Sequence, residues 1–137
     1  MSIVSFNVKL VGQNMAQHQS KRSKGIHFEQ IAADYLGRQG LILIEKNFLA
    51  RGGELDLIMR DSTSLVFVEV KYRRSQTYGH AAETVTRQKQ LRLIKTANWW
   101  MLKRGLNADA TDFRFDVVAI HGNGNHIEWI KNAITEG

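Results

Sequence analysis

The chain has 137 residues and no cysteine, which excludes disulfide bonds, thiol catalysis and thiolate-bound zinc. Its length allows one hydrophobic core, and no apolar run approaches the roughly 18 residues that a membrane helix needs. Lysine and arginine outnumber aspartate and glutamate by 19 to 13. The N-terminus lacks the charged-then-apolar order of a secretory signal, so we expect a cytoplasmic protein.

The positive charge is concentrated in one part of the chain. Between Lys71 and Arg104 there are nine basic residues and a single acidic residue, Glu83. A basic block beside clustered carboxylates suits a polyanion that is held near a metal ion. The alternative is a solvated helix face, and charge alone favours neither interpretation.

The first 24 residues differ in composition from the rest. The stretch QNMAQHQSKRSKG is polar and basic and has no aromatic residue, which predicts a flexible basic N-terminal tail over residues 1–24. Met15 is an alternative start to Met1. No internal repeat or linker follows, so residues 25–137 are expected to form a single domain.

Hydrophobic periodicity predicts two helices and five strands in the remainder. Apolar residues at helical spacing predict a helix over residues 25–38, and Gly40 suits the chain reversal after it. A second helix is expected over about residues 86–104. The strands are expected at residues 41–47, 54–60, 65–73, 113–120 and 126–130. The order αβββαββ predicts an α/β domain with a mixed central sheet and flanking helices.

The strand over residues 65–73 carries charges on one face. Val66, Val68 and Val70 share one side, while Glu69 and Lys71 share the other, because side chains alternate along a strand. In an ordinary half-buried strand such charges face solvent. A site that binds a metal ion and polarises a phosphate would need the same pair, so the neighbouring strand decides between the two interpretations.

The preceding strand supplies further carboxylates. Alternation predicts Glu54 and Asp56 on one face and Leu55 and Leu57 on the other. If a hairpin joins the two strands, Asp56 and Glu69 lie near the same end of adjacent strands. Two carboxylates and a lysine would then converge within side-chain reach.

Such a cluster suits a divalent cation. Adjacent carboxylates repel and raise one another's pKa, so the fold tolerates them best when a cation lies between them. Mg²⁺ typically takes one or two protein carboxylates and keeps several waters, and we expect Mg²⁺ or Mn²⁺ at Asp56 and Glu69. The Val70 carbonyl is a further candidate ligand. Lys71 would position the attacking water or stabilise charge on the phosphate.

These elements resemble the PD-(D/E)XK nuclease superfamily, which includes restriction endonucleases and Holliday-junction resolvases. The motif is Asp56 followed by Glu69-Val70-Lys71, although leucine replaces the proline before Asp56. Within the superfamily the chain is similar to the YraN-like family over roughly residues 25–131, in the blocks GIHFEQIAADYL, RGGELDLIMRD, LVFVEVKYRR, TVTRQKQLRL and RFDVVAI. The resemblance implies a restriction-endonuclease-like core and a metal-dependent endonuclease. Its candidate substrate is DNA, including branched or junction DNA, and its candidate assembly is a homodimer.

The resemblance brings further residues into the site. Glu29 matches a helical glutamate of resolvase-like members and would assist as a ligand or base; the alternative is a solvated helix glutamate. Gln88 and Lys89 open the second helix, where such nucleases often place a polar residue facing the site. Arg114 and Asp116 are expected to pair internally. The residues expected to contact nucleic acid are Arg73, Arg74, Arg87, Gln88, Lys89, Arg92 and Lys95.

Two other function classes stay open. The chain could be a nucleic-acid-binding module with this fold and little turnover. It could also be a protein-interaction domain with structural ion pairs, in which case neutralising Asp56 would destabilise it because Lys71 would lose a partner. Glu54 is either an auxiliary ligand or the partner of a nearby arginine. Tyr72 and Trp99 could stack on bases, although side chains of this type more often pack in the protein.

Overall fold

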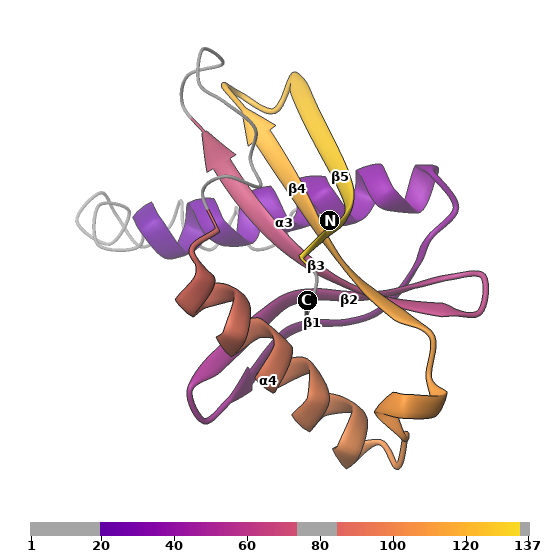
Figure 1. Ribbon diagram of the computed structural model, residues 1–137. Helices are drawn as coiled ribbons and strands as arrows, with labels where there is room; N and C mark the ends of the chain where they lie inside the picture. The colour runs from indigo at the N-terminus through magenta and orange to yellow at the C-terminus, as the bar shows by residue number, and fades with distance from the viewer. Residues whose placement is uncertain (1–19, 74–84, 135–137) are drawn as a thin grey trace, which may run out of the picture.

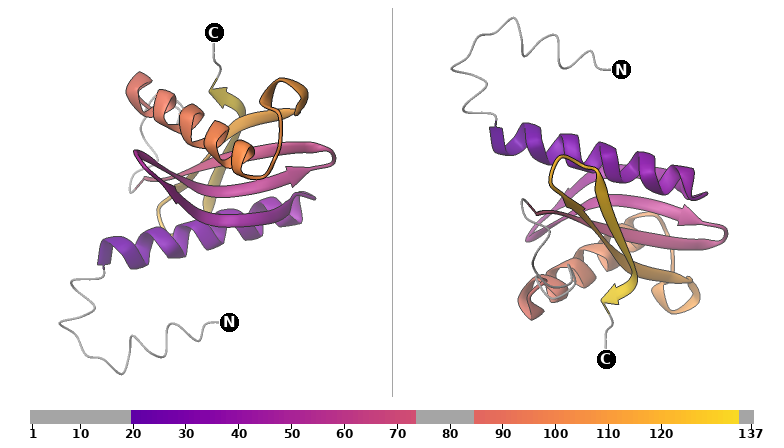
Figure 2. Two further views of the ribbon diagram at one scale, coloured as in Figure 1. Left: turned by 90° about the horizontal axis from the view of Figure 1, so that it is seen from below. Right: turned by 90° about the horizontal axis from the view of Figure 1, so that it is seen from above.

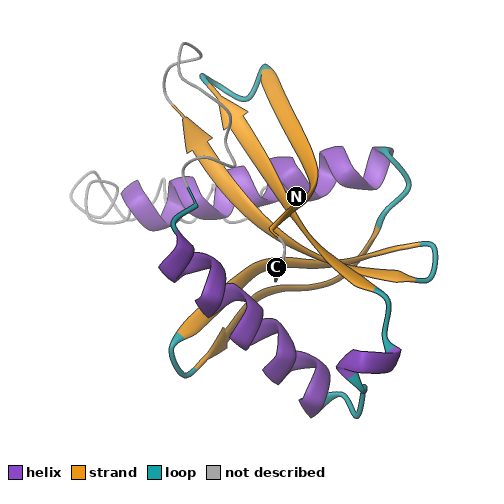
Figure 3. Cartoon of the chain, in the orientation of Figure 1, coloured by secondary structure: helices purple, strands orange, loops and turns teal. Residues whose placement is uncertain are grey.

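The computed structural model describes residues 20–73 and 85–134. Residues 1–19 of the predicted flexible tail (residues 1–24) and Arg74 lie outside this description, whereas residues 20–24 of that tail belong to the first helix. The described elements are α3 (Ser20–Arg38), β1 (Ile42–Ala50), β2 (Gly53–Asp61), β3 (Ser64–Arg73), α4 (Arg87–Lys103), the short 3₁₀ helix η2 (Ala108–Ala110), β4 (Phe113–His121) and β5 (His126–Ile134) (Figures 1 and 3). Apart from η2, this is the predicted order αβββαββ. No described helix is long and apolar enough to cross a membrane.

The five strands form one mixed sheet in the order β1-β2-β3-β4-β5. The first three are an antiparallel meander, β3 and β4 are parallel, and β4 and β5 are antiparallel. Parallel strands need a long crossover connection, and α4 lies within it. Figure 2 shows α3 and α4 on opposite faces of the sheet. The predicted fold class is therefore confirmed, and the architecture is consistent with a restriction-endonuclease-like core.

Each helix buries one face against the sheet. On one side α3 packs Phe28, Ala32 and Leu36 against strand residues that include Val66 and Val68. On the other side α4 contributes Leu93, Ala97, Trp100 and Met101 to a core with Leu55, Ile58 and Phe67. The helical spacing seen in the sequence is therefore the spacing of buried side chains.

The start of α4 is fixed by a cap. The Thr86 hydroxyl accepts a hydrogen bond from the Lys89 backbone N–H at 3.1 Å. The Gln90 side chain donates to the Val85 carbonyl at 3.0 Å. Because the free N–H groups of a first turn need such partners, the Thr86 hydroxyl marks where the helix begins. It also places Lys89 in the first turn of α4.

Three elements extend beyond their predicted limits. The helix α3 begins at Ser20 rather than Gly25, because the polar residues of its first turns carry no apolar signal. The strand β1 continues to Ala50. The strand β5 continues to Ile134, through Asn132 with a positive φ of 53°.

The prediction that Leu55 and Leu57 share a face is wrong. Leu55 packs in the core beneath α4, whereas Leu57 packs in the core beneath α3. The alternation of β2 therefore breaks at Asp56. The same position is where β2 and β3 separate, since their pairing ends at Leu57 and Val68.

Candidate functional site

Asp56 and Glu69 lie where β2 and β3 stop pairing. Asp56 directly precedes Leu57, and Glu69 directly follows Val68; Leu57 and Val68 are the last paired residues of the two strands. The Val70 N–H donates a hydrogen bond to Asp56 Oδ2 at 2.9 Å. The N–H and C=O of one strand residue point to the same side, so the Val70 carbonyl is also directed toward β2.

The half-buried Asp56 carboxyl holds a proton at neutral pH when no cation is present. Burial and the Glu69 carboxylate raise its pKa from 3.8 to about 8, and Glu29 adds to the shift. The hydrogen bond from the Val70 N–H opposes this rise. A hydrogen bond between the Asp56 and Glu69 side chains accompanies the protonated form. A cation between the two groups would remove the repulsion that raises the pKa.

Two lysines reach the Glu69 carboxylate, which is only 5% exposed. Lys89 Nζ lies 2.6 Å from Glu69 Oε2, and Lys71 Nζ lies 3.6 Å from the same oxygen. Burial lowers the pKa of Lys71, and the neighbouring Lys89 ammonium lowers it further against the effect of Glu69. Burial also opposes the charge of Lys89, but its hydrogen bond to Glu69 raises the pKa of Lys89 overall.

Glu29 enters the site from α3. Its side chain is half-buried, and Oε1 is buried without a hydrogen-bond partner among the described residues. Burial raises the pKa of Glu29, and the carboxylates of Glu54 and Glu69 add to the rise. A hydrogen bond with the Asn47 side chain and the charge of Lys46 oppose it.

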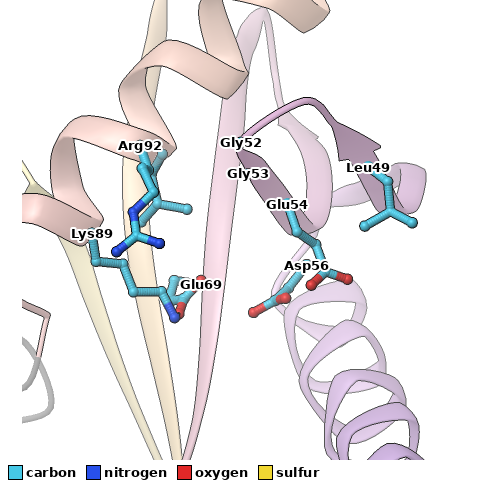
Figure 4. A pocket seen from close by; sticks show the side chains of 9 residues that line it. Leu49, Gly52, Gly53, Glu54, Asp56, Glu69, Lys89 and Arg92 are labelled. Atoms are coloured by element: carbon cyan, nitrogen blue, oxygen red, sulfur yellow. The ribbon is translucent and has the colours of Figure 1, made fainter.

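Two cavities meet at Asp56, Glu69 and Lys89. The cleft on the α4 side has a volume of ≈ 660 Å³, and its other lining residues are Leu49, Gly52, Gly53, Glu54, Arg92 and Leu93 (Figure 4). The cavity on the α3 side has a volume of ≈ 410 Å³, and its other lining residues are Gly25, Phe28, Glu29, Val70, Lys71 and Tyr72. The carboxylate pair is thus reached from both faces of the sheet.

The basic residues of α4 divide by position. Lys89 and Arg92 extend toward Glu69 in the cleft (Figure 4). Lys95 lines an adjoining groove at the β1–β2 turn. Arg87 and Gln88 are exposed and line neither cavity of the site. Only part of the predicted nucleic-acid-binding set therefore borders the carboxylates.

The remaining charged candidates lie at the margins. Arg73 ends β3 and is half-buried, and its carbonyl accepts the Gly122 N–H at 2.9 Å. Glu54 extends from β2 into the cleft (Figure 4). Within the described residues Glu54 pairs with neither Arg51 nor Arg60, which leaves its carboxylate available to a bound cation.

Asp116 has a structural role. Its fully buried carboxylate accepts hydrogen bonds from Arg114 Nε at 3.0 and 3.2 Å, Trp129 Nε1 at 2.9 Å and the Asn132 N–H at 2.9 Å. Arg114 also bonds Asp61 at 3.0 Å. The predicted internal pairing is confirmed, and it joins β4 to the extended end of β5.

The donor set fits a hard divalent cation. Among the residues that the structure describes, no group of three or more His, Cys, Asp or Glu side chains is placed to hold a metal ion. Mg²⁺ does not require three, since it commonly takes one or two carboxylates and fills the remaining positions with water and phosphate oxygens. Asp56, Glu69 and the Val70 carbonyl supply oxygen ligands of this kind. Burial and the Glu69 carboxylate raise the pKa of Asp56, and a cation bound between the two carboxylates would lower it.

Sequence reasoning missed three features of the site. The first is the short contact between Lys89 and Glu69, because it depends on where α4 crosses the sheet. The second is Asn47, which hydrogen-bonds Glu29 from a backbone with a φ of 56°. An asparagine within a strand pattern was the available signal. The third is the stacking of Phe28 on Tyr72, with ring centroids 4.1 Å apart, which walls the α3-side cavity.

Comparison with known proteins identifies the relatives of this chain. The model of "Uncharacterised protein family UPF0102" matches residues 28–120. A UPF0102 protein of Vibrio cholerae serotype O1 is 63% identical over 118 residues, which cover 86% of this chain and 97% of that protein. UPF0102 proteins of Aliivibrio salmonicida and Aliivibrio fischeri are 56% and 54% identical over 123 residues, which cover 90% of this chain and 100% of each relative. The family match spans both carboxylates and both lysines of the site.

Proposed function

The chain belongs to the UPF0102 family, and from the site itself we propose that it is a metal-dependent endonuclease that hydrolyses phosphodiester bonds of DNA. The observation that carries the proposal is the position of Asp56 and Glu69 where β2 and β3 stop pairing. Two lysine ammonium groups lie within 4 Å of the Glu69 carboxylate. The resemblance of this motif to the PD-(D/E)XK superfamily, and of the chain to its YraN-like members, supports it.

The roles of the residues follow from their positions. Asp56, Glu69 and the Val70 carbonyl would hold Mg²⁺ or Mn²⁺, which when bound polarises a phosphate oxygen and lowers the pKa of a coordinated water. Lys71 would donate to the attacking water or to a phosphate oxygen. Glu29 would take the proton that the water loses, since a raised carboxyl pKa suits a general base near neutral pH.

The basic residues of α4 would bind the phosphate backbone of the substrate. Lys89 and Arg92 line the cleft. The phosphates of a nucleic acid bound there would be neutralised by these two side chains. Branched or junction DNA is the substrate that the resolvase resemblance favours, and a homodimer would match the two-fold symmetry of a junction.

A second candidate is a nucleic-acid-binding module with little turnover. The contact that favours it is the Lys89 ammonium, 2.6 Å from Glu69, because this cation neutralises the buried carboxylate without a metal. Such a protein would bind DNA through the same basic residues. It would need neither a divalent cation nor Lys71.

Metal binding and cleavage distinguish the two candidates. We expect calorimetry to detect Mg²⁺ or Mn²⁺ binding that Asp56→Asn abolishes, and cleavage of labelled duplex or four-way-junction DNA to require both Asp56 and Lys71. Asp109→Asn is the matched control, because it neutralises an exposed aspartate outside the site. DNA binding with neither metal binding nor cleavage would establish the binding module instead.

A further inference from the structure

A third cavity lies beside the cleft, between the β1–β2 turn and α4. This groove has a volume of ≈ 640 Å³, and its lining includes Arg51, Gly52, Lys95, Trp99 and Leu102. The side chains of Trp99 and Leu102 are 48% and 65% exposed. Large apolar side chains that gather in an exposed concave surface are typical of a binding site.

The fold does not require Trp99. Its neighbour Trp100 is the residue that α4 buries, at 3% exposure, with its Nε1 donating to Glu45 at 2.9 Å. Adjacent helical residues point about 100° apart, so Trp99 faces away from that core. Trp99 forms no hydrogen bond or ring contact with another described residue. About half of the Trp99 side chain therefore stays accessible at the groove.

The charges around the groove are of one sign. Arg51 and Lys95 are exposed, and neither forms an ion pair with another described residue. No carboxylate is among the residues that line the groove. An aromatic face between two cations is complementary to a nucleobase and its adjoining phosphates.

The groove is continuous with the cleft. Gly52 lines both cavities. Along α4, Lys89 contacts Glu69, Arg92 lines the cleft and Lys95 lines the groove, at the three-residue spacing that keeps side chains on neighbouring turns. Asp56 lies four residues beyond Gly52 along an extended chain, or about 13 Å. This separation corresponds to about four nucleotides of a B-form strand.

We propose that the groove formed by Arg51, Lys95 and Trp99 binds an unpaired nucleobase close to the cleavage position. A base inside a duplex has both faces covered by its neighbours, whereas an unpaired base can turn a face to Trp99. The substrate class is therefore nucleic acid with a single-stranded segment next to a duplex. This inference rests on the proposed nuclease cleft and adds the feature that selects its substrate.

The test compares two DNA molecules that share one duplex, one blunt and one with a single-stranded overhang. Affinities are measured in an Asp56→Asn background, which separates binding from cleavage. We expect the overhang to be preferred, and Trp99→Ala to weaken binding of the overhang about 10-fold while affinity for blunt duplex is unchanged. Leu91→Ala is the matched control, since Leu91 is 51% exposed on the same helix and lines none of the three cavities. It should alter neither affinity.

Fluorescence gives a second readout that does not depend on loss of binding. Single-stranded oligothymidylate should quench the tryptophan emission of the parent protein. Trp99→Phe should remove most of this quenching and keep the affinity within about 2-fold, because phenylalanine also stacks on bases. Quenching that persists in Trp99→Phe would overturn the inference.

Other outcomes separate this inference from the proposed function. Equal binding of blunt and overhang DNA, unaffected by Trp99→Ala, overturns the base site and leaves the nuclease cleft standing. No DNA binding by the parent protein overturns both. A dimer in sedimentation that Trp99→Ala converts to a monomer would assign the groove to a second copy of the chain, and the base site would again be overturned.

Discussion

At the scale of single residues, the site is organised around two like charges, Asp56 and Glu69, that the fold keeps together. Without a metal ion, two features reduce the repulsion between these carboxylates. A proton stays on Asp56, and the Lys89 ammonium lies on Glu69. Each compensation can be removed separately, and each removal has a distinct effect on stability.

Replacing Asp56 by asparagine is expected to stabilise the metal-free protein. Because the pKa of Asp56 rises from 3.8 when unfolded to about 8 when folded, the folded state keeps a proton that the unfolded chain has lost. The free energy of unfolding therefore falls as pH rises between these values, by up to about 1.4 kcal/mol per pH unit. Asparagine does not ionise, and its carbonyl can accept the Val70 N–H. Urea unfolding in a chelator at pH 5 and pH 8 should show a flatter profile for Asp56→Asn.

The control for this prediction is Asp109→Asn, which should keep the pH dependence of the original protein. If Asp56→Asn proves less stable at pH 8, Asp56 is an ionised partner of a structural ion pair. That result would favour the interaction-domain interpretation, in which Lys71 depends on the carboxylate.

Replacing Lys89 by methionine is expected to destabilise the metal-free protein. Glu69 would lose the ammonium 2.6 Å from its Oε2, which for a buried carboxylate costs about 1 to 3 kcal/mol. A divalent cation that occupies the site should offset this loss, so Mg²⁺ should raise the melting temperature of Lys89→Met more than that of the original protein. Differential scanning calorimetry with and without Mg²⁺ measures both effects. Lys95→Met, an exposed lysine on the same helix, should show neither, and an equal Mg²⁺ response in all three proteins would count against the metal site.

At the scale of elements, the cleft depends on how closely α4 crosses the start of β2. A Cβ atom added to Gly53 would collide with the Thr96 hydroxyl, whereas its next neighbours, Thr96 Cβ and the Arg92 carbonyl, are 3.4 and 3.5 Å away. The Thr96 hydroxyl is also bonded to the Arg92 carbonyl at 2.8 Å. Gly53 is thus a position where the β1–β2 hairpin meets the helix that carries Lys89 and Arg92.

Gly53→Ala is expected to destabilise the protein by about 1 to 3 kcal/mol, because the added methyl group overpacks this contact. In the Gly53→Ala, Thr96→Ala double variant most of the loss should disappear, since the colliding hydroxyl is absent. A double-mutant cycle by urea denaturation gives the coupling between the two positions. Additive effects would show that the destabilisation by Gly53→Ala does not arise from a collision with the Thr96 hydroxyl.

The elements were predictable where a local pattern determined them. The helical spacing of buried residues gave α3 and α4, and Thr86 marked the start of α4. The ends of β1 and β5 were not predictable from local pattern. The strand β5 continues because the buried Asp116 accepts the Asn132 N–H, a contact sixteen residues away in the chain. The break in alternation at Asp56 has the same origin, since it occurs where β2 leaves β3.

At the scale of the whole molecule, the convergence of Asp56 and Glu69 could be predicted because a hairpin sets which residues of two strands meet. The ion pair of Lys89 with Glu69 could not be, because it joins α4 to β3 across the domain. The same placement of α4 brings Lys89 and Arg92 of the basic block to the cleft at the carboxylates. The net charge is +6, and the basic residues Lys89 and Arg92 line the cleft while Arg51 and Lys95 line the groove.

Binding of duplex DNA should therefore depend on salt through the cations that border the cleft. Each phosphate contact removed lowers the slope of log affinity against log salt concentration by about 0.9, so Arg92→Gln with Lys89→Gln should lower it by about 1.8. Lys131→Gln on β5 is the matched control, because it removes the same kind of charge from a strand that borders none of the three cavities. Affinity titrations over a range of salt concentrations measure the slopes. If Lys131→Gln lowers the slope as much as either α4 substitution, DNA is held by net charge over the whole surface rather than along α4.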